Sequence, residues 1–147
     1  MNLSERLNED MKQMMKSGDK FALSVIRMIR SSVKNVEIDQ RRTLSDEEVL
    51  DILTREMKQR KDALQEFEKA GREDLADTAK AEIEVIQRYM PQPLTEHELQ
   101  AIVQETIQEV GASSKSDMGK VMSALMPKVK GRAEGRLVNE TVQRLLS

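Results

Sequence analysis

Four cationic side chains and two glycines share the nine positions from Lys128 to Arg136, within the stretch KVKGRAEGRLVN. The cations are Lys128, Lys130, Arg132 and Arg136, and the glycines are Gly131 and Gly135. Bare backbone N–H groups at the start of a helix bind anions, and clustered Lys and Arg side chains neutralise the phosphates of nucleic acids. The chemistry that these residue types support is therefore phosphate binding.

Aromatic residues are missing from this segment, and they make up only 2% of the whole chain. Proteins that bind single strands stack the bases on aromatic side chains, so the segment has no platform for that mode of binding. Any contact with nucleic acid is expected through backbone and shape, as on a folded, double-helical RNA surface. Solvated surface charge is the alternative, and the residues alone weigh the two readings equally.

The glycines admit a structural and a functional explanation. Gly131 is expected to end a helix in the left-handed conformation, after cations that suit the last turn. Gly135 is expected at the start of the last helix, and Gly119, beside Lys120, inside the helix before it. Glycine in a helix interior costs about 1 kcal/mol relative to alanine. Either a tight helix crossing excludes a side chain at these positions, or an anion approaches the bare backbone.

The loop between Gly111 and Lys120 superficially resembles two catalytic motifs. A phosphate-binding P-loop needs four residues between its glycines and Ser or Thr after its Lys, whereas here seven residues intervene and Val121 follows. A Ser–Lys nucleophile pair, suggested by Ser113, Ser114 and Lys115, needs a desolvated lysine, which a linker loop between exposed helices does not provide. We expect neither activity.

Metal and acid–base chemistry have little support in the composition. The chain has no cysteine and one histidine, His97, which is expected on the surface in the first turn of a helix. A lone histidine does not make a typical transition-metal site. Carboxylate pairs such as Glu47 with Glu48 lie on densely charged helices, without the apolar setting that raises a carboxyl pKa. The sequence predicts no metal, no cofactor and no catalytic residue.

Composition bounds the fold and the compartment. The 147 residues suffice for one domain or two small ones, and 34% charged residues with only three prolines favour helices with wet outer faces. No apolar run approaches the roughly 20 residues of a membrane span, and the N-terminus lacks the apolar block of a signal peptide. We therefore expect a cytosolic location, which the absence of cysteine also suits.

Apolar residues recur with helical spacing along most of the chain. The predicted helices cover residues 3–16, 19 to about 40, the cap at 45 to 71, about 73–90, the cap at 95 to 110, a short stretch at 118–125, and about 134–146. Arg27, Arg30 and Lys34 share one face of the second helix, because they are three and four residues apart. Arg60 interrupts the apolar stripe of the third helix.

The segment Met90-Pro-Gln-Pro-Leu94 is the predicted domain boundary, since two prolines in three residues cannot continue a helix. We expect an all-α, multihelical fold, with an N-terminal array of about four helices over 1–92 and a C-terminal three-helix subdomain over 93–147. Charge is polarised within the second part. Residues 95–110 carry four glutamates and no Lys or Arg, whereas residues 115–136 carry six cations and two acids. Such asymmetry bears on partners.

Three stretches closely resemble the GatB/YqeY family: DMGKVMSALMPKVKGRAEGRLVN, QRKDALQEFEKAGREDLADTAKAEIEVIQRYMP and PLTEHEL. The resemblance covers essentially the whole chain and implies an α-helical fold of two subdomains. The same module forms the tail of the B subunit of the tRNA-dependent amidotransferase, which converts misacylated Glu-tRNA or Asp-tRNA to the amide form. In that enzyme the tail is implicated in gripping tRNA, while kinase and amidase chemistry lies elsewhere.

The family resemblance extends to the basic segment, with Glu134 standing where the family more often has Asp. The positions that match are Gly119, Lys120, Lys128, Lys130, Gly131, Arg132, Gly135 and Arg136. Three hypotheses follow. The chain is a tRNA-binding accessory module without chemistry of its own, or it has carbon–nitrogen ligase activity with glutamine as donor inside a complex, or it is a protein-binding adaptor in translation. The expected partners are tRNA and, second, a translation enzyme, with no membrane and no metal.

Overall fold

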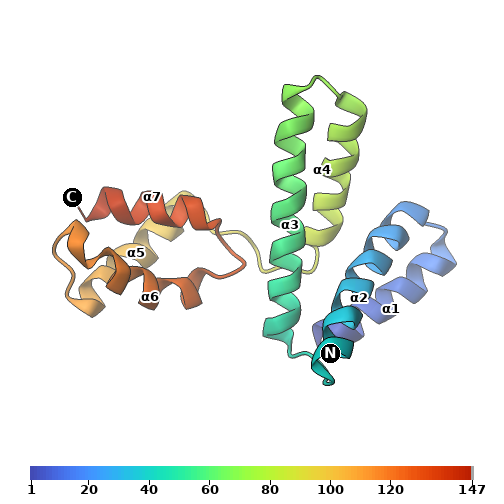
Figure 1. Ribbon diagram of the computed structural model, residues 1–147, viewed down its shortest axis with the longest axis horizontal. Helices are drawn as coiled ribbons and strands as arrows, with labels where there is room; N and C mark the ends of the chain where they lie inside the picture. The colour runs from blue at the N-terminus through green and yellow to red at the C-terminus, as the bar shows by residue number, and fades with distance from the viewer. Residues whose placement is uncertain (147) are drawn as a thin grey trace. The chain divides into compact units, whose positions relative to one another are not determined.

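The computed structural model describes residues 1–146, which form seven α-helices and no strand (Figure 1). The all-α, multihelical fold class is therefore confirmed. The helices are α1 (Leu3–Ser17), α2 (Lys20–Gln40), α3 (Asp46–Lys69), α4 (Glu73–Gln87), α5 (Glu96–Val110), α6 (Met118–Val129) and α7 (Gly135–Leu145). A single 3₁₀ turn, η1 (Lys115–Asp117), leads into α6.

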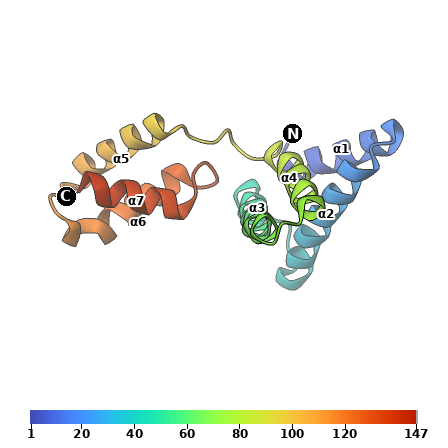
Figure 2. The same ribbon diagram turned by 90° about the horizontal axis from the view of Figure 1, so that it is seen from above.

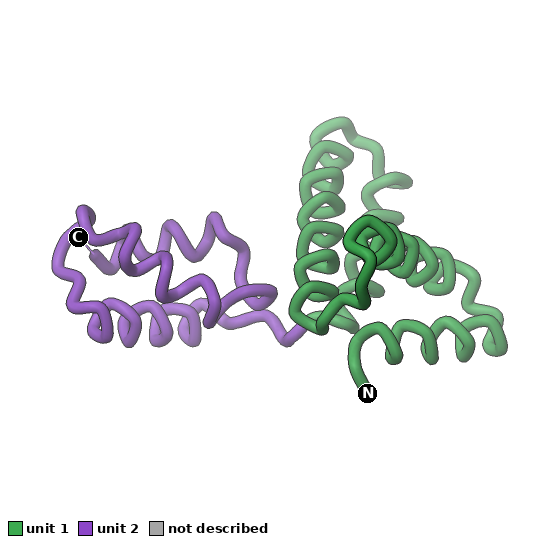
Figure 3. Tube along the Cα trace, turned by 60° about the horizontal axis from the view of Figure 1, so that its bottom comes forward, with its two compact units in different colours: residues 1–90 green, residues 91–147 purple. Residues whose placement is uncertain are grey.

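The chain divides into two compact units, Met1–Met90 and Pro91–Ser147 (Figure 3). Unit 1 contains α1 to α4, and unit 2 contains α5 to α7. The division lies at the first proline of the Met90–Leu94 segment, two residues before the one predicted from the sequence.

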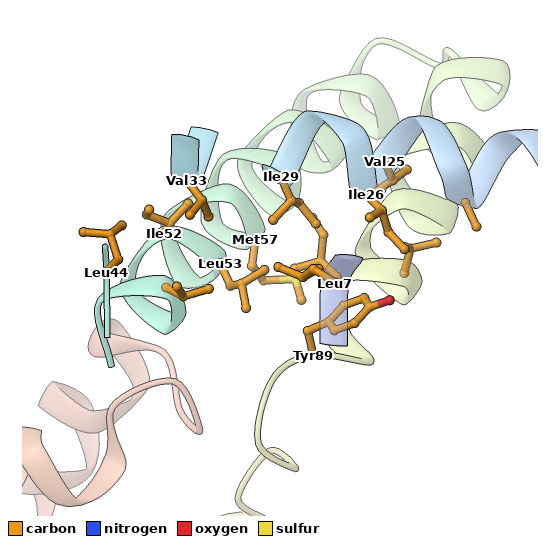
Figure 4. Packing of buried hydrophobic residues seen from close by; sticks show 14 residues of the cluster. Leu7, Val25, Ile26, Ile29, Val33, Leu44, Ile52, Leu53, Met57 and Tyr89 are labelled. Carbon is orange, nitrogen blue, oxygen red and sulfur yellow. The ribbon is translucent and has the colours of Figure 1, made fainter. Parts of the chain in front are cut away.

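Unit 1 consists of two helical hairpins, α1 with α2 and α3 with α4 (Figures 1 and 2). Apolar side chains from all four helices and from the loop after α2 meet in one core (Figure 4). The fully buried members of this core include Leu7, Ile26, Ile29, Val49, Leu53 and Ile86. Their spacing of three and four residues is the pattern from which the helices were predicted.

Two helix starts follow the predicted capping boxes. The Glu48 N–H donates to Ser45 Oγ at 3.3 Å, and the Ser45 N–H donates back to Glu48 Oε1 at 3.1 Å. Thr95 and Glu98 repeat this exchange at the start of α5, with both distances 3.1 Å. Each pair satisfies two backbone donors that the first turn leaves without partners, which fixes where the helix begins.

Helix α4 ends at Gln87, three residues before the predicted end at Met90. The chain tightens here, because the N–H groups of Arg88, Tyr89 and Met90 each donate to the carbonyl three residues earlier. Such bonds are common in the last turn of a helix, and Pro91 cannot continue the ladder. Tyr89 is nevertheless buried in the core of unit 1.

The structure explains why Arg60 interrupts the apolar stripe of α3. Its guanidinium lies 2.6 Å from Glu56 on the same helix and 2.9 Å from Glu82 on α4. The Arg60 side chain is only 11% exposed. Arg60 therefore joins the two helices of the second hairpin through a largely buried ion pair network.

Unit 2 is a three-helix arrangement around a second apolar core. Its buried members are Leu99, Val103, Val121, Leu125, Val129, Val138, Val142 and Leu146. Two buried hydroxyls accompany them, and Thr106 and Thr141 each donate at 2.8 Å to the carbonyl four residues earlier. Within residues 1–146, no helix combines the length and apolar character needed to cross a membrane.

Candidate nucleic-acid interface

A five-residue turn, 130–134, connects α6 to α7 and contains the centre of the basic segment. Gly131 has φ of 75°, so the predicted left-handed stop is confirmed. The N–H groups of Arg132 and Ala133 donate to the Val129 carbonyl at 2.9 and 3.2 Å. These bonds close the end of α6 and fix the path of the backbone through the turn.

Arg132 fastens this turn to the beginning of unit 2. Its carbonyl accepts from the Leu94 N–H at 2.8 Å, and its Nε donates to the Gln92 carbonyl at 3.1 Å. The pKa of Glu98 is lowered, chiefly by hydrogen bonds from Thr95 and to a lesser extent by the charge of Arg132. The guanidinium thus has an architectural role within the unit.

Lys128 is also engaged within unit 2. Its ammonium donates to Glu109 Oε2 at 2.7 Å and to Thr106 Oγ1 at 2.9 Å, and both partners are on α5. About a third of the Lys128 side chain is exposed. Lys128 therefore connects the end of α6 to α5. Its partners Glu109 and Thr106 are 19 and 22 residues away in the sequence, so no local sequence pattern predicts these contacts.

Gly119 and Lys120 lie exposed in the first turn of α6. The Lys120 side chain makes no hydrogen bond or ion pair with any residue from 1 to 146. Its charge acts on Asp117, whose pKa is lowered mainly by hydrogen bonds from the Ser113 and Ser114 N–H groups and further by Lys120. Lys120 is thus an exposed cation at the start of a helix.

Gly135 and Arg136 are the first two residues of α7. The Arg136 guanidinium lies 3.1 Å from Glu140, one turn further along, and its side chain is 84% exposed. Exposed ion pairs of this kind contribute little to stability and are screened by salt, so the Arg136 guanidinium can readily exchange Glu140 for another anion. Lys130 stands at the end of α6, half-buried.

Close packing does not account for Gly119 or Gly135. A Cβ placed on either residue would meet nothing within 4 Å. Neither residue has a positive φ, unlike Gly131. The tight helix crossing considered from the sequence is therefore wrong for these two glycines, because an alanine would fit both the space and the backbone.

The structure separates the predicted cations into two places. Helices α6 and α7 form a hairpin, so the start of α6 and the turn 130–134 lie at opposite ends of it (Figure 1). A helix of 12 residues is about 18 Å long. Gly119 and Lys120 are at one end, whereas Lys130 to Arg136 are together at the other.

Acidic and histidine side chains do not assemble into a metal site within the part of the chain that the structure describes. No group of three or more His, Cys, Asp or Glu side chains is placed to hold an ion. His97 is exposed in the first turn of α5.

Comparison with protein families matches residues 4–146 to the family described as "Yqey-like protein". Three similar curated proteins are named "Altered inheritance of mitochondria protein 41, mitochondrial". The one from Pyrenophora tritici-repentis is 28% identical over 144 residues, which cover 96% of this chain and 79% of the relative. Those from Lachancea thermotolerans and Candida glabrata are 35% and 40% identical, over 75% and 60% of this chain. The chain spans 60% and 50% of these two relatives.

The names of these relatives contradict the cytosolic location predicted from the sequence, since each names a mitochondrial protein. The prediction rested on the missing signal-peptide pattern and on the absence of cysteine. A missing signal peptide argues only against the secretory route, and a chain without cysteine suits any compartment. Neither observation separates the cytosol from the mitochondrion.

Proposed function

The chain belongs to the Yqey-like family, and from this premise we propose that unit 2 is an accessory module that binds tRNA through its phosphates. The relation to the tail of the tRNA-dependent amidotransferase is part of this proposal, and it comes from the resemblance of the basic segment to the GatB/YqeY family. In this role the module holds RNA for a reaction that another protein performs.

One observation supports the proposal above the others. The first turns of α6 and α7 each contain an exposed glycine followed directly by an exposed cation, Gly119 with Lys120 and Gly135 with Arg136. Nothing inside the described molecule requires glycine at these positions. A bare backbone beside a cation is the arrangement that lets a phosphate approach the first turn of a helix.

The helix caps support the proposal at the start of α7. Side chains accept from the first turn of α1, α2, α3 and α5, whereas the N-cap side chains of α4 and α7 accept nothing. Helix α6 continues directly from η1, which Ser114 and Asp117 cap. The first-turn N–H groups carry part of the positive end of the helix dipole. An anion at the start of α7 would therefore not displace a side-chain cap, and one at the start of α6 would approach Gly119 and Lys120 just after the capped η1 turn.

Two other cations of the basic segment, Lys128 and Arg132, hold the first turns of α6 and α7 at a fixed separation. Lys128 attaches α6 to α5, and Arg132 attaches the turn to the beginning of unit 2. Two phosphate contacts near the ends of a helix about 18 Å long favour a ligand with a rigid, folded surface. Double-helical RNA is recognised in this way, by shape and backbone.

The test is a salt series of the full chain binding to bulk tRNA. We compare the native chain with a Lys120→Gln, Arg136→Gln variant and with an Arg55→Gln, Lys80→Gln control. The control removes the same charge from exposed positions of unit 1 that make no ion pair within residues 1–146. The slope of log K against log salt should fall by roughly 0.9 for each lost phosphate contact.

The outcomes are distinct. A shallower slope in the Lys120, Arg136 variant alone supports the proposal. Equal slopes in variant and control, or native binding that is insensitive to salt, would overturn it. The ligase and adaptor hypotheses stay predictions. Ammonia release from glutamine by the purified chain would establish the first, and a nuclease-resistant complex with a translation component would establish the second.

A further inference from the structure

A row of cations runs along the outer face of α2 in unit 1. Arg27 and Lys34 are seven residues apart on α2, so they share a face and lie about 10.5 Å apart along the helix axis. Arg41 follows seven residues later, directly after the end of the helix. All three are exposed, and their side chains form no hydrogen bond or ion pair with another residue in the described range 1–146. We call these three residues the α2 strip.

Arg30 does not belong to the strip, although the sequence placed it on the face of Arg27 and Lys34. Its Nη1 lies 2.9 Å from the sulfur of Met11 on α1, and the residue is half-buried. Arg30 therefore packs in the first hairpin. The unpaired charge continues instead to Arg41, just beyond the last residue of α2.

Arg41 has an unusual backbone for its residue type. Its φ and ψ are 54° and 41°, and it is the only residue other than glycine with a positive φ in residues 1–146. Helices α1 and α5 end in the same conformation with Gly18 and Gly111. Side chains are disfavoured there, so the arginine at this position is a departure that needs an explanation.

The side chain of Arg41 lines an open hollow of about 260 Å³ at the end of α2. Its lining residues are Lys34, Glu37, Ile38, Arg41, Arg42 and Thr43. Glu37 accepts from the Leu44 N–H at 3.0 Å, and Arg42 donates to Glu48 at 2.7 Å. Lys34 and Arg41 thus remain available for an anion.

The rest of α2 favours a nucleic-acid backbone over a membrane surface. A helix that lies on a membrane buries its apolar face in lipid, but the main apolar face of α2 is committed to the core (Figure 4). The large apolar side chains that α2 leaves exposed are Phe21, Met28 and Ile38. Val25, Ile26, Ile29 and Val33 are at most 6% exposed. Exposed Ser31 and Asn35 lie between the cations, exposed Ser24 lies one turn before Arg27, and such side chains commonly contact phosphate and sugar.

We propose that the α2 strip and the hollow at its end form a second phosphate-binding surface, which holds the RNA backbone with unit 1. The ligand class rests on the function proposed for unit 2, while the residues are different.

The test uses the full chain with a Lys34→Gln, Arg41→Gly variant, beside the same Arg55→Gln, Lys80→Gln control. The strip variant should lower the salt slope for bulk tRNA by about 1.8, which corresponds to two lost phosphate contacts. Glycine suits the left-handed backbone at position 41, so Arg41→Gly alone should melt at a temperature equal to or above that of the native chain. A loss of binding in that variant then reflects the missing cation and not a damaged fold.

Several results would overturn the inference. One is a strip variant with the slope of the control. Another is a strip variant that loses binding to vesicles containing phosphatidylserine but keeps its binding to tRNA, which would make the occupant a lipid surface. The Lys120, Arg136 variant separates this inference from the function of unit 2. If only the unit 2 variant weakens binding, the strip is excluded; if only the strip variant does, the strip stands and the unit 2 proposal fails.

Discussion

The ammonium of Lys128 lies 2.7 Å from the carboxylate of Glu109 and also reaches the buried hydroxyl of Thr106. Sequence reasoning treated Lys128 and Lys120 alike, as cations of one basic segment. The structure distinguishes them, because Lys128 has two partners on α5 and Lys120 has none among residues 1–146. The two lysines should therefore differ in what their removal does.

We expect Lys128→Met to lower the free energy of unfolding by about 1 kcal/mol, because it removes a half-exposed ion pair with a second hydrogen bond. It should leave the salt slope of tRNA binding unchanged. Lys120→Met should do the reverse, with native stability and a shallower slope. Urea denaturation and the salt series measure the two effects, and a reversal of the pattern would reassign both residues.

The three glycines of the basic segment should respond differently to alanine. Gly119→Ala and Gly135→Ala should raise the free energy of unfolding by up to about 1 kcal/mol, since both sites have open space and helical backbone. Gly131→Ala should lower it by about 1 kcal/mol, because φ of 75° disfavours a side chain.

Binding provides the other half of this prediction. If phosphates approach the bare backbone, the two stabilised variants should bind tRNA more weakly than the native chain. Denaturation curves and affinities measured on the same preparations give both numbers. Stabilised variants with native affinity would show that no ligand comes close to these helix starts.

Features with a local signal could be predicted from the sequence. The capping boxes at Ser45 and Thr95 were predicted from pairs of residues three positions apart. The helix end at Gly131 was predicted from a glycine that follows a helical apolar stripe. The all-α class was likewise predicted from the composition and from the helical spacing of the apolar residues. These features depend on backbone physics within one or two turns.

Features that depend on distant partners could not be predicted. The sequence showed Arg60 as an interruption but did not show Glu82, which is 22 residues away. It placed Arg30 on the outer face because helical spacing alone does not show which neighbour covers a side chain. The sequence contains no pattern that predicts the left-handed backbone of Arg41, since this conformation is normally predicted from a glycine.

Arg60→Met should lower the free energy of unfolding by about 3 kcal/mol, because it leaves Glu56 and Glu82 without their cation in a largely buried site. A triple variant, Arg60→Met with Glu56→Gln and Glu82→Gln, should recover most of this loss. Urea denaturation of the three proteins tests it. Equal losses in the single and triple variants would show that packing of the arginine stem, and not the charge, is what matters.

Stability should fall in acid partly through Glu48. Hydrogen bonds from Arg42, and next from the Ser45 N–H, lower the pKa of Glu48 from 4.5 to about 2. A carboxyl group with a lower pKa in the folded state stabilises the fold above its unfolded pKa and loses this contribution as the pH falls. Glu48→Gln should therefore lower the melting temperature at pH 7, and the difference from the native chain should shrink between pH 4.5 and 2. A difference independent of pH would contradict this assignment.

Tyr89, the only tyrosine of the chain, makes the opposite prediction at high pH. Its hydroxyl donates to Asp10 at 2.6 Å, and Arg6 lies 4.8 Å from the ring centre. Burial first, and then Asp10, raise the pKa of Tyr89 above its usual value of 10. Because the folded pKa is raised, the contribution to stability is complete below pH 10 and is lost as the pH rises.

The phenolate of Tyr89 should therefore appear only as unit 1 unfolds, and absorbance with circular dichroism can follow both events in one titration. Asp10→Asn removes the anionic acceptor, so the phenolate should appear at a lower pH in that variant. The chain has no tryptophan, which leaves the tyrosine signal unobscured. Ionisation near pH 10 with the helices intact would mean that the ring is not held against Asp10 in solution.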